Sequence, residues 1–232
     1  MKIKALILDA GGVMVKAVHG AWNIPAEYKN ILGKYAADVG SEKWQAAHDQ
    51  NCHIIREDIL MPADTDKEYI LRREFFAAMA KDLEWQLTET QLNDIARDFT
   101  YNPLRYIWYD DVNAYLKKWH GSIKTGMLSD AMPSFRDFTV DHASDIYFDE
   151  ILLSTDIGAT KPNPAMYETI CERLGVKPEE CLFVDDREIN LSGAQKCGIR
   201  AVQMDREGDV IYWNGPVVHN FEELNRFMEE IN

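Results

Sequence analysis

Four apolar strands can be read from the pattern of hydrophobic positions, and each leads to a polar residue at or beyond its end. They are residues 3–8 leading to Asp9, 123–128 to Ser129, 151–153 to Lys161, and 181–184 to the pair Asp185 and Asp186. In an open parallel sheet the carboxyl ends of the strands share one edge, and ligands bind there. The pattern therefore predicts that carboxylates, a hydroxyl and an ammonium group converge on one point.

Residues 18–102 show a different pattern, with apolar positions at helical spacing and no convincing strand. The spacing predicts helices over 24–39, 42–55 and 67–83. Thr88 followed by Gln91 predicts a capping box at the start of a fourth helix. Pro103 disfavours helical backbone in Asn102 and marks a return linker. We therefore expect a helical domain over 18–102, inserted into a second domain made of residues 1–17 and 103–232.

Helices and strands alternate after Pro103, which is typical of a parallel sheet covered by helices. The sequence predicts helices over 111–119, from Pro164 to Gly175 with Asn163 as N-cap, from after Asp186 to Gly198, and from Asn220 onward with Glu223 at the box position. Two further short strands are expected at 201–204 and 217–218. The predicted fold class is α/β, with a doubly wound parallel sheet and an inserted helical domain.

The 232 residues carry a formal net charge of −14, which disfavours binding to nucleic acid or to an anionic membrane surface. The four cysteines form neither a CxxC pair nor a zinc spacing, so we expect reduced thiols. The apolar run at the start is too short for a secretory signal or a membrane span. We expect a cytoplasmic protein, monomeric or homodimeric, whose partner is a small molecule.

Four segments resemble, in this order, the four motifs of the haloacid dehalogenase superfamily. They are residues 7–13, 127–130, 158–164 and 183–186. The match is to the subgroup with a helical cap inserted after the first motif, and it covers about 1–17 and 103–232. The cap matches only in length, position and helical character. Each motif alone is a weak signal, but four in order at strand ends are a strong one. The resemblance implies a Rossmann-like catalytic core and a cap over 18–102.

The resemblance also implies a role for each polar residue. Asp9 would be a nucleophile that forms an aspartyl-phosphate, and Ser129 and Lys161 would hold the phosphoryl group. Gly11, Gly12 and Asp130 would complete the substrate site, because glycine lets the backbone turn sharply beside a ligand. Mg²⁺ would be held by oxygens of Asp9, the Gly11 carbonyl, Asp185 and Asp186, since this ion prefers hard oxygen ligands.

One position departs from the family pattern of phosphatases, which usually carry a second Asp two residues after the nucleophile. That residue protonates the leaving group, and this chain has Gly11 there. General acid–base catalysis is typically worth about 10²–10⁴-fold in rate. Another group such as His48 or His53 would have to supply the proton, or the substrate has a good leaving group, or turnover is slow.

The departure leaves alternatives to a Mg²⁺-dependent phosphatase of a small phosphorylated metabolite. Dehalogenases of the superfamily lack the second Asp and need no metal, although an acidic pair at the fourth motif argues against that branch. Phosphonate hydrolases use a lysine of the cap as a Schiff base, for which Lys29, Lys34 and Lys43 are available. A protein that binds metal and phosphate with little or no turnover is a third alternative.

Overall fold

The computed structural model describes residues 2–56, 64–141, 145–208 and 213–231. These residues form two compact units. Unit 1 comprises 1–16, 108–131 and 136–232, and unit 2 comprises 17–107 and 132–135. Each unit has its own hydrophobic core. Among the described residues, no helix is both long enough and apolar enough to cross a membrane.

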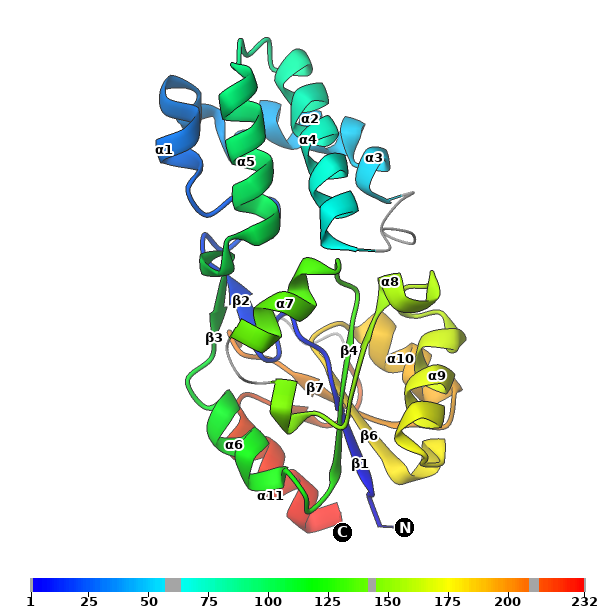
Figure 1. Cartoon of the computed structure of the whole chain (residues 1–232). Helices are drawn as coiled ribbons and strands as arrows, with labels where there is room; N and C mark the ends of the chain where they lie inside the picture. The colour runs from blue at the N-terminus through cyan, green and yellow to red at the C-terminus, as the bar shows by residue number, and fades with distance from the viewer. Residues whose placement is uncertain (1, 57–63, 142–144, 209–212, 232) are drawn as a thin grey trace. The chain divides into compact units, whose positions relative to one another are not determined.

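Unit 1 contains a six-stranded parallel sheet in the order β5-β4-β1-β6-β7-β8 (Figure 1). Its strands are β1 (Ala5–Leu8), β4 (Lys124–Ser129), β5 (Glu150–Leu153), β6 (Cys181–Asp185), β7 (Arg200–Met204) and β8 (Val217–Val218). The chain runs outward from β1 to β4 and β5 and then returns to β6 on the other side of β1. This reversal is the topological switch point at which open α/β sheets bind ligands, and it confirms the predicted doubly wound α/β core.

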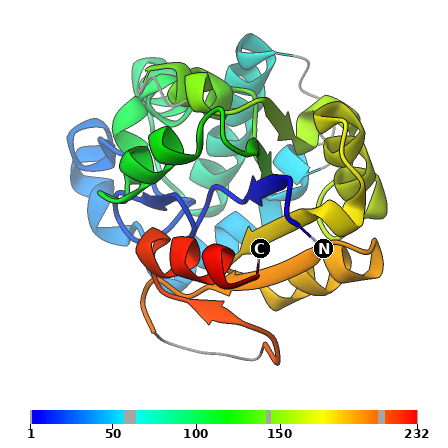
Figure 2. The same cartoon turned by 90° about the horizontal axis from the view of Figure 1, so that it is seen from below.

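Helices cover both faces of this sheet, as Figures 1 and 2 show. On one face α9 (Pro164–Leu174) and α10 (Glu188–Lys196) pack against the strands. On the other face α6 (Val112–Trp119) and α11 (Phe221–Ile231) pack together, with the rings of Trp119 and Phe221 5.4 Å apart. With both faces covered, β1 is buried at every position, which explains its continuous apolar sequence.

Unit 1 also holds the short helix α8 (Ser154–Ile157) and the 3-10 turns η3 (Asp145–Tyr147) and η4 (Pro178–Glu180), whereas α7 (Ser134–Asp141) starts in unit 2.

The caps predicted for α9 are present. The Asn163 side chain accepts a hydrogen bond from Ala165 N, and Gly175 ends the helix in the left-handed conformation. Asn220 caps α11 by accepting from Glu223 N, but Glu223 bonds His219 N rather than completing a box with Asn220.

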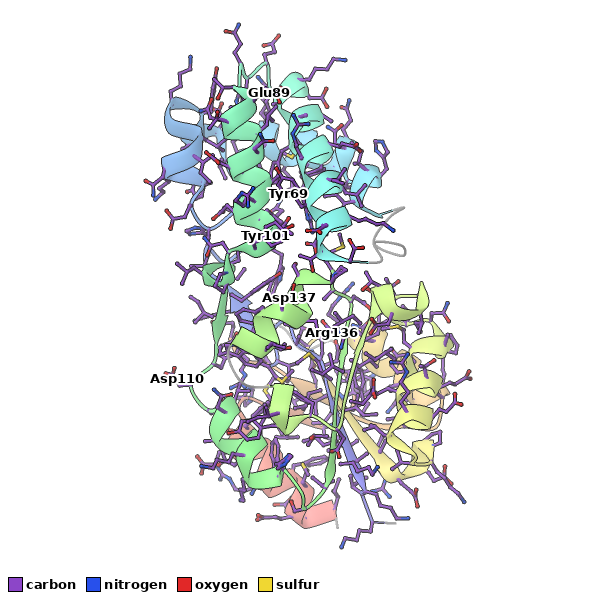
Figure 3. The ribbon with its side chains drawn as sticks, in the orientation of Figure 1. Tyr69, Glu89, Tyr101, Asp110, Arg136 and Asp137 are labelled. Atoms are coloured by element: carbon purple, nitrogen blue, oxygen red, sulfur yellow. The ribbon has the colours of Figure 1, made fainter. Side chains whose placement is uncertain are left out.

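Unit 2 is helical. Its helices are α1 (Tyr28–Leu32), α2 (Glu42–Asn51), α3 (His53–Arg56), α4 (Thr65–Asp82) and α5 (Glu89–Tyr101), with 3-10 turns η1 (Gly33–Asp38) and η2 (Pro103–Arg105). Its core is rich in aromatic residues, including Trp44, Phe75 and Phe99. Figure 3 shows Tyr69 of α4 beside Tyr101 of α5, with ring centroids 6.0 Å apart.

Two helix predictions for this unit need correction. The helix expected over 24–39 is a short α-helix followed by η1, because Gly33 adopts a φ of +55° that a regular helix cannot contain. The helix expected over 42–55 is divided into α2 and α3 at Cys52. The capping box of Thr88 and Gln91 is confirmed, with both reciprocal hydrogen bonds present.

The units are joined where the chain passes through a two-stranded ribbon that was not predicted. It pairs β2 (Val15–Ala17) with β3 (Tyr106–Trp108). The boundaries of the compact units fall after residues 16 and 107, where we had placed them after 17 and 102. Strands of three residues carry too little periodicity to be recognised in the sequence.

A further difference is that Met132–Phe135 belongs to unit 2 although it follows β4 of unit 1 directly. Glu68 of α4 explains this, because its fully buried carboxylate accepts 2.9 Å hydrogen bonds from both the backbone N–H and the hydroxyl of Ser134. Burial raises the pKa of Glu68, while Arg72, 3.8 Å away, opposes the rise. A buried carboxylate needs such partners, so the segment is tied to α4.

Candidate active site

Asp9 lies directly beyond β1, the strand that both β4 and β6 flank. Leu8 is in register with Met127 on one side and with Val184 on the other. The backbone N–H of Asp9 donates to Val184 O at 2.9 Å, which continues the ladder by one residue. This register brings the ends of β4 and β6 to the level of Asp9, so the predicted convergence at the sheet edge occurs.

Lys161 connects these strand ends through its ammonium group. Its Nζ donates to Asp9 Oδ1 at 2.6 Å, to Asp185 Oδ2 at 2.9 Å and to Leu128 O at 3.1 Å. The side chain is only 1% exposed. Burial disfavours the charged ammonium, but Asp185 and Asp9 outweigh that effect and hold the pKa of Lys161 above its ordinary value. Lys161 therefore holds a fixed positive charge in contact with Asp9, the carboxylate that the sequence predicts as nucleophile.

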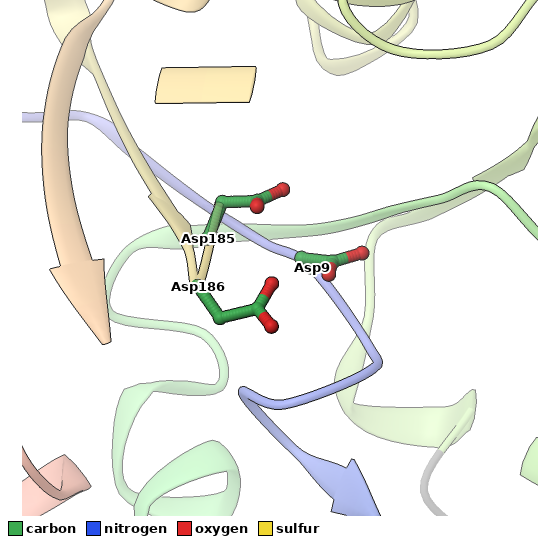
Figure 4. Close-up of side chains that lie close together, drawn as sticks. All are labelled: Asp9, Asp185 and Asp186. Atoms are coloured by element: carbon green, nitrogen blue, oxygen red, sulfur yellow. The ribbon is translucent and has the colours of Figure 1, made fainter. Parts of the chain in front are cut away.

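Asp9, Asp185 and Asp186 form an acidic cluster, shown in Figure 4, in which one oxygen from each lies within 4.8 Å of the others. Burial raises the pKa of Asp9 to about 8, and the charges of Asp185 and Asp186 add to the rise while Lys161 opposes it. Burial and then Asp185 raise the pKa of Asp186 to about 6. The raised pKa values of Asp9 and Asp186 show that one ammonium does not compensate three ionised carboxylates. The site fits a divalent cation, because it offers hard oxygen donors and a cation would favour their ionised forms.

The two carboxylates of the fourth motif have different surroundings. Asp185 is fully buried, and its oxygens accept from Lys161, from Arg187 N at 2.8 Å and from the Asn190 amide at 3.0 and 3.1 Å. Asn190 thus holds the buried carboxylate of this loop from α10. Asp186 is only partly buried and has fewer such partners, which favours it as the direct metal ligand.

Gln203 is a residue of the site that sequence reasoning missed. Its side-chain N–H donates to the backbone oxygen of Asp186 at 2.9 Å and fixes the end of β6 from the neighbouring strand β7. Gln203 is in register with Asp185. The only signal in the sequence was one polar residue among the apolar residues of the expected strand 201–204.

The loop after Asp9 depends on glycine for a steric reason. Gly12 has a φ of +72°, and a Cβ atom built on it would lie 2.5 Å from Asp186 Oδ2. A side chain there would combine backbone strain with displacement of a carboxylate of the cluster. Gly11 lies one residue earlier and pairs with Val15 in an isolated bridge. Both glycines lie on the loop that begins at Asp9.

Ser129 and Asp130 lie at the end of β4. Ser129 is 5% exposed and is the last residue of the strand. Asp130 Oδ1 accepts from the backbone N–H of Lys161 at 2.9 Å, so it holds the lysine-bearing loop in place. Burial raises the pKa of Asp130, while Lys161 opposes the rise. The structure thus gives Asp130 a contact with the loop of the third motif.

The lysines and histidines of unit 2 that the sequence offered as alternatives show none of the features of a catalytic group. Lys29, Lys34 and Lys43 are exposed, and each of the first two lies over the ring of the tyrosine next to it in sequence. His48 bonds the neighbouring Asp49, and His53 bonds Gln50 O. A Schiff-base lysine needs a lowered pKa, which burial usually supplies, so the exposure of these lysines weighs against a phosphonate hydrolase.

Comparison with known proteins supports the assignment made from the motifs. A family model described as haloacid dehalogenase-like hydrolase matches residues 3–198. Phosphatase MT3486 of Mycobacterium tuberculosis is 32% identical over 137 residues, 58% of this chain and 62% of that protein. (S)-2-haloacid dehalogenase 4A of Burkholderia cepacia is 35% identical over 82 residues, 35% of this chain and 36% of that protein. The matches thus span less than two thirds of these relatives.

Among solved structures, the L-2-haloacid dehalogenase of Xanthobacter autotrophicus with chloropropionic acid covalently bound has a similar fold. The TM-score is 0.71 at 19% identity, over 99% of this chain and 100% of that one. At this identity the likeness concerns the fold alone. Together, the match to the family model over most of the sequence, the doubly wound core and the four motifs at its strand ends show that the chain belongs to the haloacid dehalogenase-like hydrolases.

Proposed function

We propose that this chain is a Mg²⁺-dependent phosphatase that hydrolyses a small phosphorylated metabolite through an aspartyl-phosphate at Asp9. The observation that carries the proposal is the site itself, in which Lys161 lies 2.6 Å from Asp9 Oδ1 beside the cluster of Asp9, Asp185 and Asp186. A phosphoryl group is an anion that approaches a carboxylate nucleophile, so its transfer needs a cation to offset the repulsion. Dehalogenases of the superfamily need no metal, so dehalogenation would give the cluster of Asp9, Asp185 and Asp186 no metal to hold. The 32% identity to Phosphatase MT3486 also supports this reading.

In the proposed reaction an oxygen of Asp9 attacks phosphorus, and the bond from phosphorus to the leaving-group oxygen breaks with its electron pair going to that oxygen. Water then attacks phosphorus, the bond to Asp9 breaks, and inorganic phosphate leaves. Lys161 holds one Asp9 oxygen by a charge-assisted hydrogen bond, which directs the other toward the substrate. Splitting one displacement into two easier steps is the advantage of a covalent intermediate.

The chain's residues would hold Mg²⁺ through Asp9, Asp186 and the backbone carbonyl of Gly11, with Asp185 buried behind them. When bound, the ion supplies positive charge that offsets repulsion between the nucleophile and the phosphoryl oxygens. The Ser129 hydroxyl and backbone N–H would donate to a phosphoryl oxygen. The elevated pKa of Asp9 in the metal-free protein, about 8, means that metal binding must release a proton near neutral pH.

This proton linkage predicts how pH changes stability. The pKa of Asp9 rises from 3.8 to about 8 in the folded protein, so the folded state binds more protons between these values. The free energy of unfolding of the metal-free protein should therefore fall as pH rises through that window. Calorimetry in EDTA should give a lower Tm at pH 9 than at pH 6, with a smaller difference in Asp9→Asn. Mg²⁺ should raise Tm more at pH 9, and equal effects at both pH values would contradict the linkage.

Gly11→Asp should increase turnover of alkyl phosphates, whose poor leaving groups need a proton. We expect a gain of up to about 10²-fold, which is the lower end of the range typical of general acid catalysis. Turnover of p-nitrophenyl phosphate should change much less, because p-nitrophenolate leaves without a proton. Because both substrates are measured with the same variant, p-nitrophenyl phosphate serves as the control for the alkyl phosphates. An unchanged alkyl phosphate rate would show that another group already donates the proton.

The first test is hydrolysis of p-nitrophenyl phosphate with Mg²⁺ and with EDTA. Turnover that requires the metal supports the proposal. A folded protein that binds Mg²⁺ and a phosphate mimic without turnover would instead be a binding protein.

Dehalogenation is the second candidate, favoured by Gly11 and by the identity to (S)-2-haloacid dehalogenase 4A. It is tested by chloride release from (S)-2-chloropropionate in EDTA. Release of chloride without phosphatase turnover would replace the present proposal.

A further inference from the structure

A second charged cluster lies against the loop that follows the nucleophile, within unit 1. Arg206, two residues after β7, points its guanidinium group at the backbone oxygen of Val13. Nε and Nη2 both donate to this oxygen, at 3.1 and 2.8 Å, although the two residues are 193 positions apart. The Arg206 side chain is only 7% exposed. One carbonyl of the nucleophile loop is thus held by two donors of a buried cation.

The guanidinium is itself fixed from the other side. Its Nη1 donates to both oxygens of Asp111, at 3.0 and 2.8 Å. Asp111 Oδ2 also accepts from the backbone N–H of Phe221 at 2.8 Å, so the same carboxylate caps the start of α11. The guanidinium carbon lies 4.3 Å from the ring centre of Tyr109 and 5.0 Å from that of Phe221. A cation held by a carboxylate and two aromatic faces has little freedom to move.

The loop that Arg206 contacts is a turn closed by its own backbone hydrogen bonds. Met14 N and Val15 N both donate back to Ala10 O, at 2.8 and 2.9 Å, and Gly12 N donates to Val15 O. These bonds fix the internal shape of the turn but not its direction relative to the sheet. The hydrogen bonds from Arg206 to Val13 O fix the orientation of the turn relative to the sheet. Tyr109 N adds a second external bond, to Met14 O at 3.0 Å.

We propose that Arg206 is a positioning residue that fixes the Asp9–Val13 turn relative to Asp185 and Asp186. Through Val13 it sets where the backbone of Gly11 and the carboxylate of Asp9 lie relative to Asp186. The kinetic part of this proposal rests on the proposed phosphatase function, whereas its structural part does not. A displacement of about 1 Å at a reacting group can cost about 10²-fold in rate, so a remote clamp of this kind has a measurable effect.

The test compares Arg206→Ala with Arg226→Ala. Arg226 is a matched control, because it is an exposed arginine of α11 that pairs with Glu222, one helical turn away. With p-nitrophenyl phosphate we expect kcat of Arg206→Ala to fall by about 10- to 100-fold, the half-saturating Mg²⁺ concentration to rise, and KM to change less. Guanidinium chloride at non-denaturing concentration should restore part of kcat in Arg206→Ala and none in Arg226→Ala.

Asp111→Asn is a second variant for the case that Arg206→Ala does not fold. Its amide oxygen can still accept from Phe221 N, while the charged contact with Arg206 is lost. It should shift kcat and the Mg²⁺ requirement in the same direction by a smaller factor. A normal Mg²⁺ requirement and kcat within about twofold of the wild type, in both variants, would overturn the proposal.

Amide hydrogen exchange separates this proposal from the phosphatase assignment. Exchange at Tyr109, whose N–H is bonded to Met14 O and so ties the turn to a neighbouring segment, should accelerate in Arg206→Ala and stay unchanged in Arg226→Ala. This result supports the clamp even if the wild-type protein hydrolyses no phosphoester, in which case only the assigned reaction fails. Unchanged exchange in a folded Arg206→Ala variant refutes the clamp whatever the activity.

Discussion

Asp9→Asn should yield a folded protein whose turnover of p-nitrophenyl phosphate is lower by more than about 10³-fold, as when other enzymes lose a nucleophile. The substitution keeps the size and shape of the side chain, but an amide does not attack phosphorus. Lys161 still has an oxygen to donate to, and the amide cannot acquire the charge that burial, Asp185 and Asp186 disfavour at Asp9. We therefore expect an unchanged or higher Tm in EDTA, so the loss of activity is not a loss of fold.

The matched control for this variant is Asp94→Asn, an exposed aspartate on α5 of unit 2. It should leave both turnover and Tm unchanged. Rapid-quench labelling with a ³²P-phosphoester should trap an acid-stable phosphoprotein in the wild type and none in Asp9→Asn. Turnover near the wild-type level in Asp9→Asn would rule out the covalent mechanism.

Lys161→Met should be the most damaging single substitution for stability in the metal-free protein. The Lys161 side chain is 1% exposed and contacts Asp9 at 2.6 Å and Asp185 at 2.9 Å. Removing one partner of a buried ion pair typically costs about 3–5 kcal/mol, because the other charges stay buried. Activity should fall by at least about 10²-fold, since the nucleophile also loses the group that orients it.

Mg²⁺ provides an internal check on this explanation. If the instability of Lys161→Met comes from uncompensated carboxylates, Mg²⁺ should raise its Tm by more than it raises that of the wild type. Lys196→Met, an exposed lysine in the last turn of α10, should respond to Mg²⁺ as the wild type does. A Lys161→Met variant with wild-type Tm in EDTA would mean that the cluster is not charged as described.

The sequence was sufficient to predict the sheet and the convergence of polar residues because both depend on strong local patterns. Buried parallel strands are short apolar runs, and the residue after each run must lie at the shared edge. The same holds for the caps at Thr88 and Asn163, where one side chain bonds a backbone N–H two or three residues away. Such short-range chemistry is readable without a structure.

What the sequence did not reveal depends on contacts between distant segments. Arg206 and Val13 are far apart in the chain, and an arginine in a polar loop looks like an ordinary surface charge. Gly33 in a helical pattern was compatible with either continuation or a break. The assignment of 132–135 to unit 2 involves Met132, which lies in the core of that unit, and one buried carboxylate, Glu68. No periodicity identifies Glu68 as buried, because its neighbours on α4 are also charged.

The contact between Glu68 and Ser134 has a consequence for recombination of this protein with relatives. A chimera that exchanged only the continuous segment 17–107 would introduce a foreign α4 while leaving the native Ser134 behind, because 132–135 is encoded downstream of β4. Where the foreign α4 lacks a carboxylate at the position of Glu68, the hydroxyl and the backbone N–H of Ser134 would lose their acceptor. Functional crossovers should therefore exchange the two segments together, so that this helical unit is inherited as a discontinuous module.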